Sequence, residues 1–249
     1  MSAGEITTST DAGAIGFVCG SPNALRYDWA SDDPEEVAGV LRSMMPNDVR
    51  VLDIGCGTGA VTALVNRNKN NNVCGIEPDP MRAARARTRD IEVYNGMLDE
   101  TFGSRHAPFD VVVMADVLEH VAAPVDLLGR AAGILKPGGL VLLSVPNVAH
   151  WTVRLGLLCG RFDYTETGIL DATHLRWFTQ KTIVTLCNSY GLKVLSVLQT
   201  AGSDLPEYRS LPWKFLPERL RRSIVRRLAR RPPRLFGCQH VIAARVPVR

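Results

Sequence analysis

The strongest constraint on the fold is an alternation of apolar strands and helical segments between residues 49 and 146. Five runs rich in valine, leucine and isoleucine are separated by stretches with helical spacing; the runs cover residues 49–54, 72–78, 91–95, 109–115 and 139–146. Strands that are apolar along their whole length are buried on both faces, which is typical of a parallel sheet with helices on both sides. Because crossovers between parallel strands are right-handed, this order predicts a doubly wound α/β sheet.

The alternation is interrupted twice after residue 146. We expect residues 31–249 to form one domain with insertions at 147–178 and 201–236, while residues 1–30 form a flexible segment or lid. The pattern resumes with a helix over 179–190, a strand over 192–200 and a closing strand over 240–248. Ahead of the first strand, Asp33 and Glu36 predict a helix whose N-cap is Asp33.

The cysteine spacing and the hydropathy of the chain indicate in which cellular compartment the protein works. The six cysteines include no C-x-x-C pair, which argues against a zinc ribbon or a secreted disulfide scaffold. The chain contains no run of 18 apolar residues and begins without a basic segment followed by an apolar one. We therefore expect a cytoplasmic protein.

The sequence VLDIGCGTG over residues 51–59 joins the first strand to the next helix through a tight glycine loop. A P-loop needs lysine and serine or threonine after its last glycine, but Ala60 and Val61 follow Gly59 here. A dinucleotide loop is more widely spaced, and the Asp53 carboxylate would repel its pyrophosphate by about 1–4 kcal/mol at about 4 Å. The same carboxylate suits a ligand with an amino group and a sulfonium, such as S-adenosylmethionine (SAM). Glu77 ends the second strand, where an acid can accept hydrogen bonds from both ribose hydroxyls.

Four segments, VLDIGCGTG, GIEPDP, FDVVVMADVLEHV and LKPGGLVLLSVPN, resemble in order and spacing the successive motifs of class I SAM-dependent methyltransferases. The resemblance covers about residues 48–200 and is to bacterial small-molecule enzymes related to the ubiquinone-pathway and methionine-biosynthesis types. It implies a Rossmann-like seven-stranded sheet whose last strand is antiparallel, with a lid after the fifth strand. SAM would lie across the carboxyl ends of the strands.

The resemblance also implies which residues bind SAM. The glycine loop would approach the methionine part, Glu77 would hold the ribose, and Pro78 and Met81 would flank the adenine. Met97 stands where an acid is common, which leaves the adenine amine to Asp99 or to backbone groups of Met97 and Leu98. The expected cofactor residues are Asp53, Gly55, Cys56, Gly57, Gly59, Glu77, Pro78, Met81, Met97, Leu98, Ala115 and Asp116.

Asp116, Glu119 and His120 follow the fourth strand as a D-x-x-E-H motif. An alcohol acceptor must lose its proton during methyl transfer, and a histidine with a pKa near neutrality suits that role. Three interpretations stay open: His120 is a general base, it caps and packs, or the three side chains bind a divalent cation. A similar motif binds a cation in the ubiquinone-pathway O-methyltransferases, and two carboxylates favour magnesium over zinc. The motif does not decide among these readings, and we assign no metal.

Residues 147–178 are rich in aromatic side chains and histidine, and long structured insertions are usually lids or binding loops. We expect His150 and His174 as further candidate bases and Arg176 as a side chain that binds an anionic or hydroxyl-rich group. The aromatic side chains that would stack on a sugar or ring are Tyr27, Trp151, Tyr164 and Trp177. The alternative is a helical lid whose aromatics belong to the core.

Residues 214–234 contain nine lysines and arginines, and their apolar residues recur every four positions at Leu216, Leu220, Ile224 and Leu228. This pattern predicts an amphipathic helix with an arginine face. It either docks on the domain by its apolar stripe or lies on an anionic membrane surface as a peripheral contact. We expect no nucleic-acid binding, because no interleaved aromatic pattern accompanies the basic residues.

Together these features favour a SAM-dependent methyltransferase that acts on oxygen of a small hydroxylated acceptor, such as a sugar, a glycan or a natural-product intermediate. Two enzymatic alternatives are a metal-assisted O-methyltransferase of a quinone-like phenol and an N-methyltransferase. A third alternative is a SAM-binding regulatory protein without catalysis. The sequence allows a monomer or a homodimer.

Overall fold

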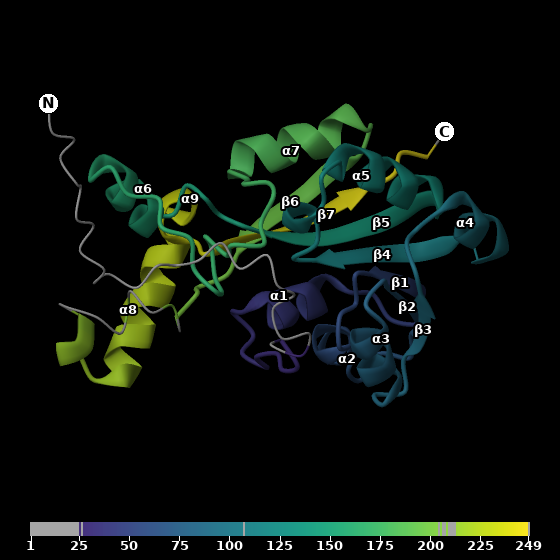
Figure 1. Cartoon of the computed structure of the whole chain (residues 1–249), viewed down its shortest axis with the longest axis horizontal. Coiled ribbons are helices and arrows are strands. Elements are labelled where there is room, and N and C mark those ends of the chain that lie inside the picture. Colours follow the sequence, from purple (N-terminus) through teal and green to yellow (C-terminus); the bar gives the residue numbers. More distant parts are fainter. Residues whose placement is uncertain are drawn as a thin grey trace, which may run out of the picture.

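The computed structural model describes residues 25, 27–106, 108–203, 205, 208 and 213–248. We expected residues 1–30 to form a flexible segment or lid. Residues 1–24 and 26 of this segment lie outside the described residues. Figure 1 shows a single twisted sheet with helices on both faces. The strands are β1 (Arg50–Ile54), β2 (Asn72–Glu77), β3 (Glu92–Asn95), β4 (Phe109–Ala115), β5 (Leu135–Pro146), β6 (Lys193–Gln199) and β7 (Gln239–Arg245).

The sheet is seven-stranded, with the order β3-β2-β1-β4-β5-β7-β6. Strands β1 to β5 are mutually parallel, and β7 runs antiparallel to both of its neighbours, β5 and β6. The strand order reverses between β1 and β4, and in such sheets ligands bind outside the carboxyl ends of the strands at this point. The prediction of a doubly wound, seven-stranded sheet with an antiparallel last strand is confirmed.

Alternate residues of each central strand face opposite helical layers. Val111 and Val113 of β4 pack in one core with Leu41 of α1, whereas Val112 packs in the other core with Leu128 of α5. Both faces are therefore apolar, which explains why the strands read as continuous hydrophobic runs. The helices are α1 (Val37–Met44), α2 (Ala60–Val65), α3 (Pro80–Arg87), α4 (Glu100–His106), α5 (Pro124–Gly133), α6 (Trp151–Leu158), α7 (Gln180–Ser189), α8 (Glu218–Arg230) and α9 (Pro233–Phe236).

The first helix begins later than predicted. We expected Asp33 as its N-cap, but α1 starts at Val37, and Asp33 lies in a turn before it. The Asp33 carboxylate accepts from the backbone N–H of Glu35 at 3.0 Å and also pairs with Arg226 of α8. The residue thus closes a turn and binds a distant helix, so its carboxylate does not cap α1.

The insertion after β5 is closed at its base. The N–H of Val148 donates to the carbonyl of Phe178 at 3.0 Å, so the two ends of the segment lie side by side. Between them lie α6 and a loop that returns to the sheet edge. Figure 1 shows α6, α8 and α9 at the same end of the molecule, the end toward which β4 and β5 point.

Helix α8 docks through a face that only partly overlaps the predicted stripe, since Ile224 and Leu228 of that stripe are half-buried. Its buried residues are Val225 and Ala229, whereas Leu220 of the predicted stripe is 49% exposed. With Val225 and Ala229 buried, the neighbouring Arg226 and Arg230 reach acidic residues just before α1. Within the described residues, no helix has the length and apolar character needed to cross a bilayer.

Candidate active site

The glycine loop and the end of β2 form one structure. The N–H groups of Gly55 and Cys56 donate to the carbonyl of Ile76 at 2.8 and 3.1 Å. The N–H of Gly57 donates to one carboxylate oxygen of Glu77 at 2.9 Å, and the N–H of Asp79 donates to the other at 2.9 Å. The sequence placed the loop and the acid on neighbouring strands, and the structure brings them into contact.

Two glycines of the loop are required for different reasons. Gly57 has φ 57°, and a Cβ built on it would meet nothing within 4 Å. Gly59 has φ 78°, and its Cβ would lie 2.7 Å from the Cδ1 of Ile91. Both conformations disfavour residues with a side chain. Gly59 allows tight packing of the loop, whereas Gly57 borders open space that a ligand can enter.

Asp53 lies under this loop with one oxygen unused. Its carboxylate is 2% exposed; Oδ2 accepts from the Thr62 hydroxyl at 2.7 Å, and Oδ1 has no hydrogen-bond partner among the described residues. Burial raises the pKa of Asp53 to about 7, and the Glu77 charge adds to the rise, while the Thr62 hydrogen bond opposes it. A buried, unpaired carboxylate oxygen fits a cationic group such as the ammonium of SAM.

The side expected to receive the adenine exposes apolar side chains. Met81 is 60% exposed and Met97 is 62% exposed, whereas Leu98 is buried. Asp99, one of the alternatives for reading the adenine amine, accepts through Oδ1 from the N–H of Phe102 at 2.7 Å. Asp99 directly precedes α4, so this oxygen accepts from a backbone N–H in the first turn of that helix.

Asp116 is turned away from the other members of the D-x-x-E-H motif. It follows Ala115 at the end of β4 with φ 53°. One carboxylate oxygen accepts from the Ser144 hydroxyl at 2.7 Å, and the other accepts from the side-chain amide of Gln239 at 2.8 Å. Burial raises the pKa of Asp116, and these two hydrogen bonds act against that rise. Asp116 therefore joins β4 to β5 and β7 and does not gather with Glu119 and His120.

A carboxylate and two imidazoles gather at this edge of the sheet. Glu119, His120 and His174 each offer a ligand atom within 4.8 Å of the others. Glu119 is 1% exposed, and neither of its carboxylate oxygens has a hydrogen-bond partner among the described residues. Burial raises the pKa of Glu119 well above its usual range, and the charges of Asp116 and Asp171 raise it further. We refer to Glu119, His120 and His174 as the carboxylate–imidazole cluster.

Backbone carbonyls fix both imidazoles of this cluster. The Nδ1 of His174 lies 3.1 Å from the carbonyl of Ile169, and the Nδ1 of His120 lies 3.3 Å from the carbonyl of Thr173. A carbonyl only accepts, so Nδ1 is the donor in each of these two contacts. Such backing is the usual way in which proteins orient a basic or metal-binding imidazole.

Tyr27 connects the cluster to the glycine loop. Its hydroxyl donates to Asp171 at 2.9 Å, and its carbonyl accepts from the Thr58 hydroxyl at 3.3 Å. Asp171 in turn accepts from the Thr173 hydroxyl at 2.7 Å, beside His120. The sequence indicated Tyr27 as a substrate-stacking residue; the structure makes it a bridge over the site.

His150 and Trp151 lie away from the cluster. His150 is fully buried, its Nδ1 is 2.9 Å from the Thr152 hydroxyl, and burial lowers its pKa to about 4. Trp151 donates to the Tyr208 hydroxyl at 2.9 Å and packs against Phe236 of α9. We therefore leave both residues out of the proposed site, because their side-chain nitrogens bond to Thr152 and Tyr208.

Tyr164 and Trp177 do come together. Their ring centroids are 6.1 Å apart, and Phe162, which the sequence did not single out, lies 5.7 Å from each. Arg176 is tied back by a 2.7 Å hydrogen bond to the carbonyl of Ala122. Of the predicted substrate residues, Tyr164 and Trp177 thus form one aromatic group with Phe162, whereas Arg176 bonds to the backbone.

Comparisons with known proteins agree on the broad class. A family model described as a methyltransferase domain matches residues 27–197. The ubiquinone biosynthesis O-methyltransferase of Aromatoleum aromaticum is 28% identical over 197 residues, covering 76% of this chain and 79% of that protein. The enzyme of the same name from Maricaulis maris is 33% identical over 131 residues, 50% of this chain and 51% of that protein, so the match spans about half of its length. A SAM-dependent methyltransferase from Mesorhizobium loti has the same fold, with a TM-score of 0.55, 18% identity, and coverage of 85% of this chain and 99% of that one.

Proposed function

Because this chain belongs to the methyltransferase domain family and uses SAM as its cofactor, we propose that it methylates a hydroxyl of a ring-bearing small molecule beside the carboxylate–imidazole cluster. Strands β1, β2 and β4 are adjacent and parallel, so their carboxyl ends share one edge of the sheet. The glycine loop follows β1, Glu77 ends β2, and Glu119 and His120 follow β4. His174 joins them from the insertion after β5. Donor and acceptor would therefore meet at this edge, and much of the rate would come from positioning them.

The observation that carries the proposal is the state of Glu119. A buried carboxylate without a hydrogen-bond donor is costly unless it is protonated or faces a cation or a donor. Both of its oxygens lack a partner among the described residues, and two oriented imidazoles stand beside it. An acceptor hydroxyl placed there would supply the missing donor.

The proton balance of the reaction follows from this arrangement. SAM, when bound, would supply its methyl group to the acceptor oxygen, with the C–O bond formed as the C–S bond breaks and S-adenosylhomocysteine as the product. His120 or Glu119 would take up the hydroxyl proton. His174, backed by Ile169, would hold the acceptor in line with the methyl group.

The cluster also fits a divalent cation. One carboxylate and two imidazoles are typical of zinc, manganese or iron sites, rather than of the magnesium site that two carboxylates of the D-x-x-E-H motif favoured. A cation bound there would lower the pKa of the acceptor hydroxyl. Asp116 is not part of this ligand set, and its two oxygens accept from Ser144 and Gln239.

A phenol is the acceptor class that these residues support best. A phenol has a pKa of about 10, far closer to that of an imidazole than the pKa of a sugar alcohol, so proton transfer is easier. Phe162, Tyr164 and Trp177 offer aromatic faces near the lid. The relatives named ubiquinone biosynthesis O-methyltransferases favour the same class. A sugar hydroxyl is the second candidate, since aromatic faces also stack on sugars.

The decisive experiment measures S-adenosylhomocysteine formation with a catechol, a sugar and an amine as acceptors. The purified full chain is treated with EDTA and then assayed without metal and with zinc, manganese or magnesium added. We expect catechol turnover, with kcat lowered at least about 100-fold in Glu119→Gln and His174→Gln while the Kd for SAM stays within about threefold. Stimulation by zinc or manganese would support the cation; equal rates without metal would support His120 as the base.

The matched control is Glu100→Gln, which removes an exposed carboxylate from α4 and should leave kcat unchanged. A Glu119→Gln enzyme with near-normal kcat would refute the assigned site. Turnover of only the amine would show N-methylation instead. SAM binding without S-adenosylhomocysteine from any acceptor would favour a regulatory protein.

A further inference from the structure

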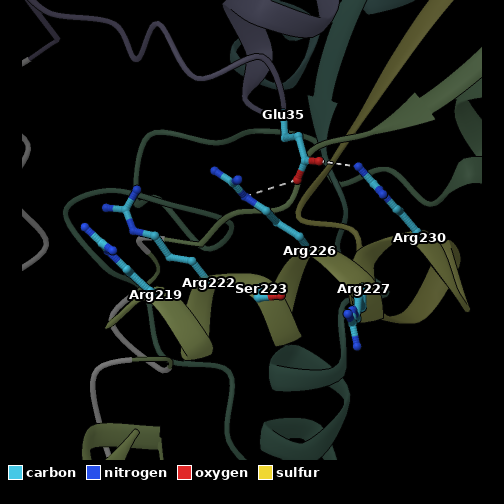
Figure 2. A pocket seen from close by; sticks show the side chains of 7 residues that line it. All are labelled: Glu35, Arg219, Arg222, Ser223, Arg226, Arg227 and Arg230. Atoms are coloured by element: carbon cyan, nitrogen blue, oxygen red, sulfur yellow. Dashed lines mark hydrogen bonds and ion pairs between the residues drawn. The ribbon is translucent and has the colours of Figure 1, made fainter. Parts of the chain in front are cut away.

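A hollow of about 410 Å³ lies between α8 and the residues just before α1. It is lined by Glu35, Arg219, Arg222, Ser223, Arg226, Arg227 and Arg230. We refer to it as the arginine cleft. Among the described residues that line it, five are arginines and one is an acid, and Figure 2 shows the arginine side chains fanning out from successive turns of α8.

Two of these arginines hold the helix in place. Arg226 pairs with Asp33 and Glu35, and Arg230 pairs with Glu35. Figure 2 shows the Glu35 carboxylate at one wall of the cleft with both guanidinium groups reaching it. Together with burial of Val225 and Ala229, these ion pairs fix which face of α8 borders the cleft.

The arginines that lie away from Glu35 are paired differently. Arg222 pairs with Glu218 within α8 at 3.0 Å, and Arg219 makes no ion pair with any described residue. Figure 2 shows Arg219 and Arg222 side by side, away from Glu35. A guanidinium presents its donors in a planar fork that matches two oxygens of a phosphate, and weak hydration makes it suited to phosphate recognition.

We propose that the arginine cleft binds a ligand carrying a diphosphate or two neighbouring phosphate groups. The volume lies within the usual range for small-molecule sites, and Ser223 adds a hydroxyl donor to the guanidinium forks. Ion pairs with Asp33 and Glu35 hold Arg226 and Arg230, so less ordering of these two side chains opposes binding than on a free helix.

The cleft is connected to the proposed active site by a short piece of chain. Tyr27 bridges the glycine loop and Asp171, and Glu35 stands eight residues later. Even fully extended, that segment spans at most roughly 29 Å. The ligand could be a phosphorylated soluble molecule or the headgroups of an anionic lipid surface, which present the same chemistry. The proposal that the arginine cleft binds phosphate does not depend on the proposed methyl-transfer function.

The test uses the full chain and a double variant, Arg219→Gln with Arg222→Gln, beside the single variant Arg219→Gln. The matched control, Arg105→Gln with Lys181→Gln, removes the same charge from exposed positions on α4 and α7. Sodium pyrophosphate is titrated calorimetrically at low and high salt. We expect the double variant to raise Kd about tenfold, the single variant less, and the control less than twofold.

A second arm separates the two sources of phosphate. The same proteins are sedimented with vesicles of phosphatidylglycerol or of phosphatidylcholine. Saturable pyrophosphate binding that the double variant loses identifies a soluble phosphorylated ligand. Sedimentation with phosphatidylglycerol alone, lost in the double variant and not competed by pyrophosphate, identifies lipid headgroups. Binding that is equal in the double variant and the control, or absent for both probes, overturns the proposal. Unchanged melting temperatures and SAM affinities establish that the variants are folded.

Discussion

Replacing Asp53 by asparagine tests how the glycine loop recognises its cofactor. Burial raises the pKa of the Asp53 carboxyl from 3.8 to about 7, and one of its oxygens has no partner among the described residues. If the ammonium of SAM pairs with this carboxylate, the pKa in the complex returns to its ordinary range. The cofactor then binds the ionised form, and below pH 7 binding must release a proton.

The size of the effect follows from the two pKa values. With a pKa of about 7 in the free protein and about 4 in the complex, SAM should bind about 50-fold more tightly at pH 7 than at pH 5, or about 2.3 kcal/mol. This range lies below the pKa of an α-amino group, so the SAM ammonium stays charged throughout.

The same residue makes the cofactor-free protein less stable as pH rises. An acid whose pKa is higher in the folded state binds its proton more tightly there, so stability falls from about pH 4 to pH 7 and stays low above. A rise from 3.8 to about 7 corresponds to roughly 4 kcal/mol at full ionisation. Asp53→Asn should remove this fall in stability.

The assay is SAM titration by calorimetry at pH 5, 6 and 7, together with thermal unfolding of the cofactor-free protein over the same range. Asp53→Asn should bind SAM more weakly at pH 7 and show less than about a threefold change between pH 5 and 7. A wild-type affinity that is flat over this range, or a variant with the wild-type slope, would refute the assigned role of Asp53.

Two further predictions concern the site. Glu119→Gln should raise the melting temperature of metal-free protein at pH 8 by roughly 2–6 °C, because a buried charge without a described partner is removed; differential scanning calorimetry will show this, and a lower melting temperature would contradict it. Gly57→Ala should weaken SAM binding at least about tenfold while costing only about 1–2 kcal/mol of stability. Gly59→Ala should cost about 2–4 kcal/mol, because its Cβ would lie 2.7 Å from Ile91. Equal destabilisation of the two glycine variants would argue against the open space at Gly57.

Some features of the site could not be inferred from spacing in the chain. The D-x-x-E-H motif places Asp116 near Glu119 and His120, but a left-handed backbone at Asp116 turns its carboxylate toward Ser144 and Gln239. These partners lie 28 and 123 residues away, on β5 and β7, and come close to Asp116 only in the folded sheet. The residues around Asp116 in the sequence give no indication of them.

The basic segment shows the same limit. A repeat every four residues predicts a helix and an apolar stripe, and α8 exists. Val225 and Ala229 face the domain, while the neighbouring Arg226 and Arg230 pair with Asp33 and Glu35. These ion pairs join residues nearly 200 positions apart, which a repeat within the segment cannot reveal.

The sequence by itself determined the parallel sheet, the glycine loop and the place of Glu77, because these depend on local hydrophobic runs and on strand ends that a parallel sheet must bring to one edge. Only the tertiary structure decided which titratable groups share the site. Glu119 and His120 lie beside His174, whereas the Asp116 carboxylate is held by Ser144 and Gln239. His174 comes from the insertion after β5, and Ser144 and Gln239 lie on β5 and β7, so the local pattern around residue 116 carries no information about these partners.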